Sequence, residues 1–171
     1  MNFEKYIKNV PDFPKKGIDF KDISPLLLDP QAFQASVDAL AKPFEKGEID
    51  LICGVEARGF IFSPSIAVKL GAGFMPVRKA GKLPGEVVME SYNLEYGDDR
   101  LEIQKGLIKK GAKVLIVDDV LATGGTVEAT QKLVEKEGAE VVGFSFLIEL
   151  GFLSGREKID HQNIFSLINF T

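Results

Sequence analysis

The sequence predicts an α/β protein built on a parallel sheet. Three apolar runs predict strands over residues 49–55, 113–119 and 139–150, because short runs of β-favouring apolar residues suit strands that are covered on both faces. Helical patterns over residues 62–71 and 126–138 follow the first two of these runs. Strands that alternate with helices form βαβ units, so the sheet is expected to be parallel.

The composition indicates one domain and a location in the cytoplasm. The chain has 171 residues, of which 45% are hydrophobic, enough for one well-buried core. The N-terminal stretch contains no long apolar run, and the only cysteine, Cys53, has no partner for an internal disulfide, so neither export nor membrane insertion is indicated. Cys53 lies among strand residues and is interpreted as a core residue. The only histidine, His161, has no second ligand at metal-binding spacing.

The charge limits the possible partners. A net charge of −4 argues against binding to nucleic acid, because phosphate contacts need clustered Lys and Arg residues. An anionic ligand must therefore be bound by a local group of residues.

Two further segments complete the predicted organisation. Residues 29–47 predict a helix with Asp29 as N-cap and Pro30 at its first position. Residues 78–104 contain an early Gly- and Pro-containing stretch and then alternating residues around a Gly-Asp-Asp turn. They predict a mobile loop that leads into a hairpin.

The stretch Val114–Thr126, VLIVDDVLATGGT, predicts a ligand site. In an open parallel sheet, ligands bind beyond the carboxyl ends of the strands, where Asp118 and Asp119 are expected. The turn at residues 122–126 then offers backbone N–H groups, two glycines and the positive end of a helix dipole. These features predict a phosphate site, with an ordinary polar turn as the alternative.

The two aspartates narrow the kind of phosphate ligand. Carboxylates repel a bare polyphosphate but accept hydrogen bonds from a vicinal diol, directly or through a cation, so a sugar phosphate is favoured. The stretch lacks the Gly-Lys-Ser/Thr ending of nucleotide-triphosphate P-loops, and it lacks the Gly-x-Gly-x-x-Gly pattern of dinucleotide folds.

The same stretch resembles the phosphoribosyl pyrophosphate (PRPP) motif of type I phosphoribosyltransferases, in the form found in the adenine phosphoribosyltransferase family. FPKKGIDFKDISPLLLDP, EARGF, RKAGKLPG, YNLEYG, LEIQK and GREK resemble segments of that family in the same order. The resemblance implies a Rossmann-like core with a small hood formed by residues 1–30 and 150–171. It also implies transfer of phosphoribose from PRPP to adenine in purine salvage, giving AMP and pyrophosphate, with Mg²⁺ carried by PRPP and no direct metal site on the protein.

The resemblance implies roles for the PRPP-binding residues. Asp118 and Asp119 would hold the ribose hydroxyls. Arg58 would meet the pyrophosphate, with an ion pair to Glu56 as the structural alternative. The residues that would hold the 5′-phosphate through their backbone are Ala122, Thr123, Gly124, Gly125 and Thr126.

Further roles fall on the basic loop and the hairpin. Arg78, Lys79 and Lys82 place three cations within five residues, which suits a lid that closes on pyrophosphate, and Lys79 is the strongest candidate for a contact. Glu95 matches the family's proton-transfer residue, with Tyr96 beside it near the reaction centre. A solvent-facing position in the hairpin is the alternative for Glu95.

The resemblance also implies an adenine site. Phe20 would stack on the base, the backbone around Asp19 and Lys21 would read the purine edge, and Leu150 would pack from the other side. A plain core phenylalanine is the alternative for Phe20. A backbone acceptor facing the adenine amino group would reject hypoxanthine and guanine, which carry a carbonyl there.

Two other functions remain open from the sequence. The first is a regulator that senses PRPP or nucleotides without catalysis, which the acidic charge disfavours if it must bind DNA. The second is a phosphoribosyltransferase for another base, which would use the same PRPP motif. The resemblance further implies a homodimer.

Overall fold

The structure is a computed structural model that describes residues 1–94, 97–159 and 163–171. Glu95, Tyr96 and His161 lie outside the described residues, so the roles predicted for them stay predictions. The chain divides into two compact units, Met1–Ala39 and Leu40–Thr171, which are described in turn. No described helix is long and apolar enough to cross a membrane.

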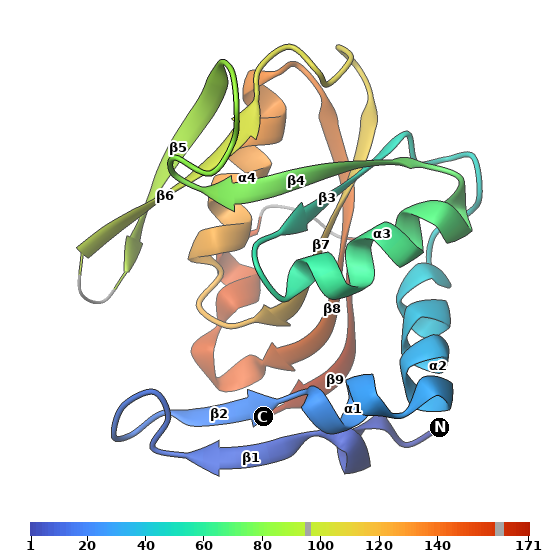
Figure 1. The fold of residues 1–171 in the computed structure, drawn as a ribbon, viewed down its shortest axis with the longest axis vertical. Helices are drawn as coiled ribbons and strands as arrows, with labels where there is room; N and C mark the ends of the chain where they lie inside the picture. The colour runs from blue at the N-terminus through green and yellow to red at the C-terminus, as the bar shows by residue number, and fades with distance from the viewer. Residues whose placement is uncertain (95–96, 160–162) are drawn as a thin grey trace. The chain divides into compact units, whose positions relative to one another are not determined.

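The first unit contains a small antiparallel sheet and short helices (Figure 1). Its elements are η1 (Phe3–Tyr6), β1 (Lys8–Pro11), β2 (Asp19–Asp22), α1 (Ser24–Leu28) and the start of α2 (Pro30–Ala41). Val10 of β1 pairs with Phe20 of β2. Asp29 accepts hydrogen bonds of 2.9 Å from the backbone N–H groups of Gln31 and Ala32, which confirms the predicted N-cap.

The helix α2 is shorter than the sequence predicts. It ends at Ala41, before the expected end at residue 47. Pro43 explains the early end, because proline has no N–H to donate and disfavours helical geometry in the residue before it.

The second unit is built on a seven-stranded sheet with the order β5-β6-β4-β3-β7-β8-β9. The pairs β3–β4, β3–β7, β7–β8 and β8–β9 are parallel, whereas β6 is antiparallel to β4 and β5. The strands are β3 (Leu51–Val55), β4 (Gly73–Lys79), β5 (Val87–Leu94), β6 (Gly97–Gln104), β7 (Lys113–Leu121), β8 (Glu140–Leu150) and β9 (Ile164–Phe170). The helical elements are α3 (Gly59–Leu70), α4 (Gly125–Lys136), η2 (Gly151–Leu153) and η3 (Gly155–Lys158).

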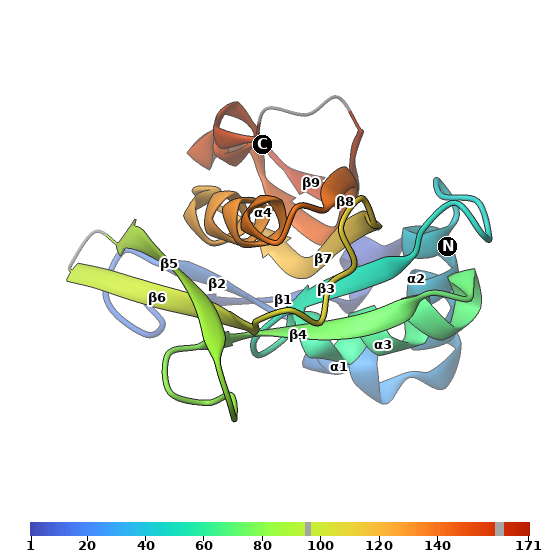
Figure 2. The ribbon, with the colours of Figure 1, turned by 90° about the horizontal axis from the view of Figure 1, so that it is seen from above.

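The order in which strands are added to the sheet reverses between β3 and β7. From β3 the chain passes through α3 to β4 on one side, and from β7 it passes through α4 to β8 on the other. The helices α3 and α4 consequently cover opposite faces of the sheet (Figure 2), as right-handed crossovers require. The carboxyl ends of β3 and β7 therefore form a topological switch point, where open α/β sheets bind ligands.

The central strands form the core of this unit, as predicted. Val114 to Asp119 of β7 are all buried, which is the pattern of a strand covered on both faces. Cys53 of β3 is fully buried, and burial raises the pKa of its thiol to about 12. It is a core residue, because a thiol of such a high pKa supplies almost no nucleophilic thiolate.

The hairpin is present, but its turn is not where the sequence predicts it. Strands β5 and β6 pair in antiparallel register, and Leu94 lies opposite Gly97. Gly97, Asp98 and Asp99 therefore belong to β6 and do not form the turn. The strand pairing sets the position of the turn, because Asp99 lies opposite Tyr92 in the ladder and is therefore part of β6.

The C-terminal segment contributes to the main sheet. Residues 164–170, which the sequence assigns to the hood, form β9 and pair in parallel with β8. Most residues of β9 are half-buried and only Ile168 is buried, which suits a strand with one partner, because an edge strand is covered less completely than a central one.

Candidate active site

Two buried carboxylates stand near the carboxyl end of β7, as the sequence predicts. Asp118 and Asp119 are only 8% and 6% exposed. Burial and the neighbouring charge of Asp119 raise the pKa of Asp118 well above its ordinary value. Burial also raises the pKa of Asp119, although the Arg58 guanidinium opposes this shift. Buried carboxylates with perturbed pKa values at a switch point are typical of functional sites.

Arg58 is brought next to these carboxylates. It follows β3 at the start of α3, and its Nε lies 2.6 Å from Asp119 Oδ2. Within the described residues, Asp119 Oδ2 nevertheless accepts no hydrogen bond of regular geometry. A buried carboxylate oxygen in this state is suited to receive a ligand hydroxyl or a cation.

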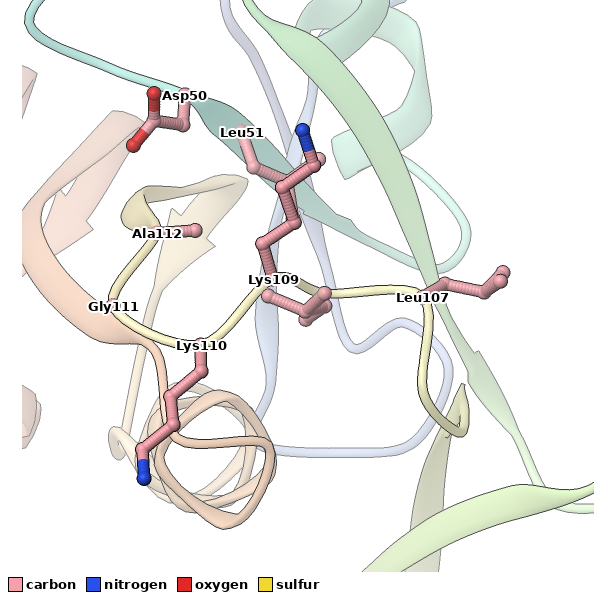
Figure 3. A pocket seen from close by; sticks show the side chains of 8 residues that line it. Asp50, Leu51, Leu107, Lys109, Lys110, Gly111 and Ala112 are labelled. Atoms are coloured by element: carbon pink, nitrogen blue, oxygen red, sulfur yellow. The ribbon is translucent and has the colours of Figure 1, made fainter.

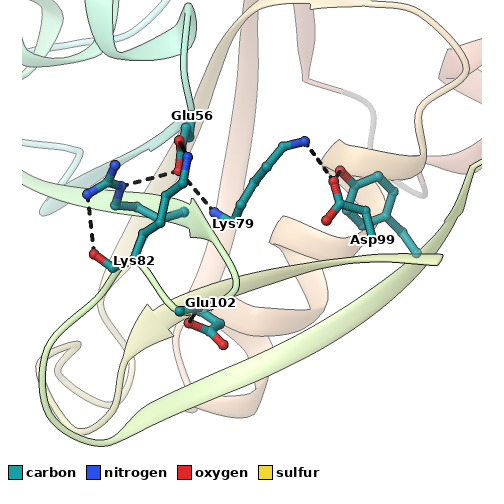
Figure 4. A network of polar contacts seen from close by, with 8 residues as sticks. Glu56, Lys79, Lys82, Asp99 and Glu102 are labelled. Carbon is teal, nitrogen blue, oxygen red and sulfur yellow. Dashed lines mark hydrogen bonds and ion pairs between the residues drawn. The ribbon is translucent and has the colours of Figure 1, made fainter.

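Glu56, the alternative partner for Arg58, contacts the residues at and after the end of β4. Its carboxylate accepts hydrogen bonds from Arg78 Nε at 3.2 Å and from the backbone N–H of Lys79 at 3.0 Å, and it forms an ion pair with Lys82 (Figure 4). Burial acts to raise the pKa of Glu56, but these hydrogen bonds outweigh it and the pKa lies below its ordinary value. Glu56 thus holds the basic loop after β4.

The glycine turn leads directly into α4. Gly124 is the N-cap residue and has φ 81°, a left-handed conformation that glycine adopts without a steric cost. The first helical bond runs from the N–H of Glu128 to the carbonyl of Gly124 at 2.9 Å. The N–H groups before it lie at the positive end of the helix dipole, the arrangement that favours a phosphate group.

Gly59 explains how the β3 and β7 ends approach each other. A Cβ atom at Gly59 would lie 2.8 Å from Asp118 Oδ1 and 3.1 Å from the carbonyl oxygen of Val117. Only glycine fits this position, so Arg58 and the two aspartates can be neighbours.

Lys79 lies in a second network that joins the basic loop to the hairpin. Its Nζ lies 2.8 Å from Asp99 Oδ2, and the Tyr92 hydroxyl donates a hydrogen bond of 3.1 Å to the same oxygen. Figure 4 shows the Lys79 side chain extending across to Asp99. The hydrogen bond with Asp99 raises the pKa of Lys79. The pyrophosphate candidate is therefore paired with a carboxylate in this structure.

The predicted adenine residues are divided between the two units. In β2, Phe20 is half-buried and its ring lies edge-on to Phe13 with centroids 5.2 Å apart. Lys21 is buried and its Nζ donates hydrogen bonds to Asp19 at 2.8 Å and Asn9 at 2.9 Å. In the second unit, Leu150 is the half-buried last residue of β8.

A cavity lies elsewhere in this unit. It has a volume of about 390 Å³ and is lined by Asp50, Leu51 and residues 107–112 (Figure 3). These residues precede or begin β3 and β7, so the cavity is at the amino ends of the strands, away from Asp118 and Asp119. Asp50 accepts a hydrogen bond of 2.8 Å from the Lys113 N–H, and the cavity brings together no buried reactive groups among its lining residues.

Some of these residues received no site role from the sequence. Asp99 was assigned to a turn, Tyr92 begins the segment YNLEYG but received no role, and Glu56, the alternative partner for Arg58, pairs with Arg78 and Lys82. The signal for Glu56 lies in the sheet, because Val55 pairs with Val77 and so brings the next residue, Glu56, beside Arg78. For the described residues, no group of three His, Cys, Asp or Glu side chains could hold a metal ion.

This fold and site define the class of protein. Residues 25–170 match the family described as "Phosphoribosyl transferase domain". The match covers most of the chain, including the switch point, the two aspartates and the glycine turn.

Comparisons with individual proteins narrow the class. Adenine phosphoribosyltransferase of Desulfitobacterium hafniense is 54% identical over 99% of this chain and 98% of its own length. The crystal structure of the Thermoanaerobacter pseudethanolicus enzyme has a TM-score of 0.94 and 54% identity, with 98% of both chains covered. The Saccharomyces cerevisiae enzyme, solved with adenine and an imino-altritol bisphosphate, has a TM-score of 0.91 and 45% identity, with 96% of both chains covered. The chain belongs to the adenine phosphoribosyltransferase family.

Proposed function

We propose that this protein transfers the 5-phosphoribosyl group from PRPP to adenine, giving AMP and pyrophosphate in purine salvage. The observation that carries the proposal is the buried Asp118–Asp119 pair at the switch point, followed by a glycine turn at the start of α4. A vicinal diol and a phosphate on one ligand match these two features. Relatives that are 54% identical over almost the full chain carry the name of this activity.

Asp118 and Asp119 would hold the ribose of PRPP. Both carboxylates are buried, and Asp119 Oδ2 accepts no regular hydrogen bond from the described residues. The 2′- and 3′-hydroxyls would donate to these oxygens, while the backbone N–H groups of residues 122–126 would bind the 5′-phosphate. Two contacts at opposite ends of the ribose fix its orientation, which lowers the entropic part of the barrier.

Arg58 and Lys79 would bind the pyrophosphate. The Nε of Arg58 forms an ion pair with Asp119. A guanidinium has further donors in the same plane, so Arg58 would contact Asp119 and the pyrophosphate at the same time. Lys79 would leave Asp99 for the pyrophosphate when PRPP binds. Cations at this place stabilise the negative charge that develops on the leaving oxygen.

The reaction would proceed by exchange of one bond at the anomeric carbon. The bond from C1 of the ribose to the pyrophosphate oxygen breaks, its electron pair leaves with pyrophosphate, and adenine N9 forms the new bond to C1. The ribose carries oxocarbenium character as this happens. The N9 proton is removed, and Glu95, with Tyr96 near it, is our candidate for the acceptor, with the hairpin position as its structural alternative.

The family resemblance supports a role for each of the predicted adenine residues. Phe20 supplies an aromatic face, and the backbone around Asp19 and Lys21 supplies the polar edge. Lys21 is held by Asp19 and Asn9, which supports a fixed backbone in β2. Leu150 would pack on the other face of the base.

Magnesium would arrive with PRPP. Mg²⁺ is usually held by one or two carboxylates together with substrate phosphates, and the Asp118–Asp119 pair fits such a shared arrangement without a dedicated metal site. When bound, the ion supplies positive charge that offsets the charge of the pyrophosphate.

The first test is AMP formation from adenine and PRPP, with and without Mg²⁺, with hypoxanthine and guanine as controls. We expect Mg²⁺-dependent product from adenine alone. Equal turnover of hypoxanthine would contradict the adenine specificity. Binding of PRPP without turnover of any base would favour the sensor, which a gel shift with duplex DNA at physiological salt would then test.

A second test addresses the aspartates. Asp119→Ala should weaken PRPP binding far more than adenine binding, because it removes a group that faces the ribose. An unchanged PRPP dissociation constant in a folded variant would contradict the role given to this carboxylate.

We also propose that the protein is a homodimer in the cytoplasm. The family resemblance supports the dimer, and the single buried cysteine is compatible with a reducing compartment. Light scattering after size exclusion would give the mass, and a species of one chain, 18.7 kDa, would contradict the dimer.

A further inference from the structure

The backbone of Gly155 packs directly against the glycine turn. A Cβ atom at Gly155 would lie 2.1 Å from the carbonyl oxygen of Ala122 and 3.1 Å from the nitrogen of Gly124. A Cβ atom at Gly124 would in turn lie 2.5 Å from the carbonyl oxygen of Gly155. Neither position has room for a methyl group, so any displacement of one backbone is transmitted to the other.

An ion pair fixes the segment that carries Gly155. Arg156 Nε and Nη2 donate hydrogen bonds of 2.6 and 2.8 Å to the two carboxylate oxygens of Glu149. The same guanidinium reaches the Ile164 carbonyl at 3.3 Å and the Ser166 hydroxyl at 3.4 Å. Because two parallel hydrogen bonds define the plane of the guanidinium, Arg156 is held against both β8 and β9.

Glu149 provides a firm anchor for this pair. It is 5% exposed and lies next to the end of β8, opposite Leu121 of β7 and Asn169 of β9. The hydrogen bonds from Arg156 outweigh burial and keep the pKa of Glu149 below its ordinary value. The carboxylate therefore remains charged at neutral pH and the pair persists.

The turn needs such support from outside. Its two consecutive glycines have large conformational freedom, while a phosphate site requires N–H groups that converge on one point. A displacement on the order of 1 Å is enough to impair a site of this kind.

We propose that Arg156 is a positioning residue for the phosphate turn. Held on Glu149, it keeps Gly155 pressed against Ala122 and Gly124, and so keeps the N–H groups of residues 122–126 directed at the 5′-phosphate of PRPP. This inference rests on the proposed role of the turn in PRPP binding. It assigns a function to the segment Gly155–Lys158, which touches no reacting atom.

The test measures two probes that occupy different parts of the PRPP site, ribose 5-phosphate and pyrophosphate. Arg156→Met keeps the apolar stem and removes the guanidinium, and Gly155→Ala places a methyl group against the turn. Both variants should bind ribose 5-phosphate about tenfold more weakly, because the displaced turn should lose about one charge-assisted hydrogen bond to the phosphate. Their pyrophosphate affinity should stay at the wild-type value.

Two further variants serve as controls. Arg156→Lys keeps the charge but loses the planar guanidinium. Its affinity for ribose 5-phosphate should lie between those of wild type and Arg156→Met. Gly151→Ala adds a methyl group in η2, just before this segment, where it would meet Asn169 Oδ1 at 3.0 Å and the Phe170 carbonyl at 3.5 Å instead of the turn. It should bind ribose 5-phosphate as wild type does. Thermal unfolding of each variant identifies loss of folding, and Gly155→Ala remains informative if Arg156→Met does not fold.

The outcomes separate this inference from the proposed function. Unchanged ribose 5-phosphate affinity in Gly155→Ala and Arg156→Met, or equal weakening of both probes, would overturn the positioning role. If Asp119→Ala still weakens PRPP binding in that case, the proposed function stands. Failure of wild-type protein to bind ribose 5-phosphate at all would instead contradict the proposed function.

Discussion

The pairing of Lys79 with Asp99 predicts that removing a carboxylate improves substrate binding. The ammonium group of Lys79 lies 2.8 Å from Asp99 Oδ2. For Lys79 to contact pyrophosphate as proposed, PRPP would have to displace this partner. Asp99→Asn weakens the competing contact and leaves Lys79 in place, so PRPP binding should become stronger.

The exposure of the pair sets the size of the effect. The Lys79 side chain is 51% exposed and that of Asp99 is 23% exposed, and ion pairs at such positions contribute about 0.2–1 kcal/mol. Since 1.4 kcal/mol corresponds to a factor of ten, the KM for PRPP should fall by about 1.4-fold to 5-fold. The difference should shrink at high salt, because exposed charges are screened.

Steady-state AMP formation at saturating adenine measures this change. Glu86→Gln is the matched control, since it removes the same charge from an 82% exposed side chain that pairs with Lys105 at the start of the hairpin. The control should keep the wild-type KM. A KM for PRPP that is unchanged or higher in Asp99→Asn would refute the exchange of Asp99 for pyrophosphate.

Three further predictions follow from the buried groups. Cys53, with its pKa raised from 9.0 to about 12, should react with iodoacetamide at least about a thousandfold more slowly in the folded protein than after unfolding, as mass spectrometry would report. Asp118→Asn should weaken PRPP binding yet raise the unfolding temperature at pH 7 by about 2–4 °C, which corresponds to about 1 kcal/mol. Because folding raises the pKa of Asp118 above its ordinary value of 3.8, this gain in stability should grow as the pH rises above 3.8 and be absent below it. Glu149→Gln should lower the free energy of unfolding by about 1.5–3 kcal/mol at pH 7. Because Arg156 lowers the pKa of Glu149 in the folded protein below its ordinary value of 4.5, the difference in stability from wild type should disappear as the pH falls below 4.5 and through the folded pKa. Urea titrations at several pH values would reveal this.

The parts of the site that the sequence predicts are those encoded locally. The apolar run before Asp118 predicts a strand, and the glycine turn and the three-four spacing after it predict a helix. Val127, Thr130, Leu133 and Val134 share a face in that pattern and are all buried in α4. A strand, a turn and a helix in this order place carboxylates and N–H groups together without information from the rest of the chain.

The partners of the charged residues could not be predicted in the same way. Lys79 and Asp99 meet only because β4 pairs with β6, with Lys79 opposite Leu101, and nothing in either local sequence indicates this register. An ion pair between Glu56 and Arg58 was the structural alternative for Arg58, whereas the parallel pairing of β3 with β4 gives Glu56 the partners Arg78 and Lys82. Charged residues are frequent and their attraction is nonspecific, so strand register decides which ones meet.

These pairings explain how a chain of net charge −4 can provide a site for a highly charged anion. Each cation of the site is held by a carboxylate, Arg58 by Asp119, Lys82 by Glu56 and Lys79 by Asp99, so the cations are positioned before substrate arrives. The three pairs differ in burial. Asp119 is buried and its pair with Arg58 is costly to break, which would keep the ribose end of the proposed site rigid. The exposed pair of Lys79 is weak, so under the proposed function Lys79 would exchange its carboxylate for pyrophosphate and return to it after release. The proposed site would therefore be fixed at the ribose and adjustable at the leaving group, which suits a reaction that releases pyrophosphate.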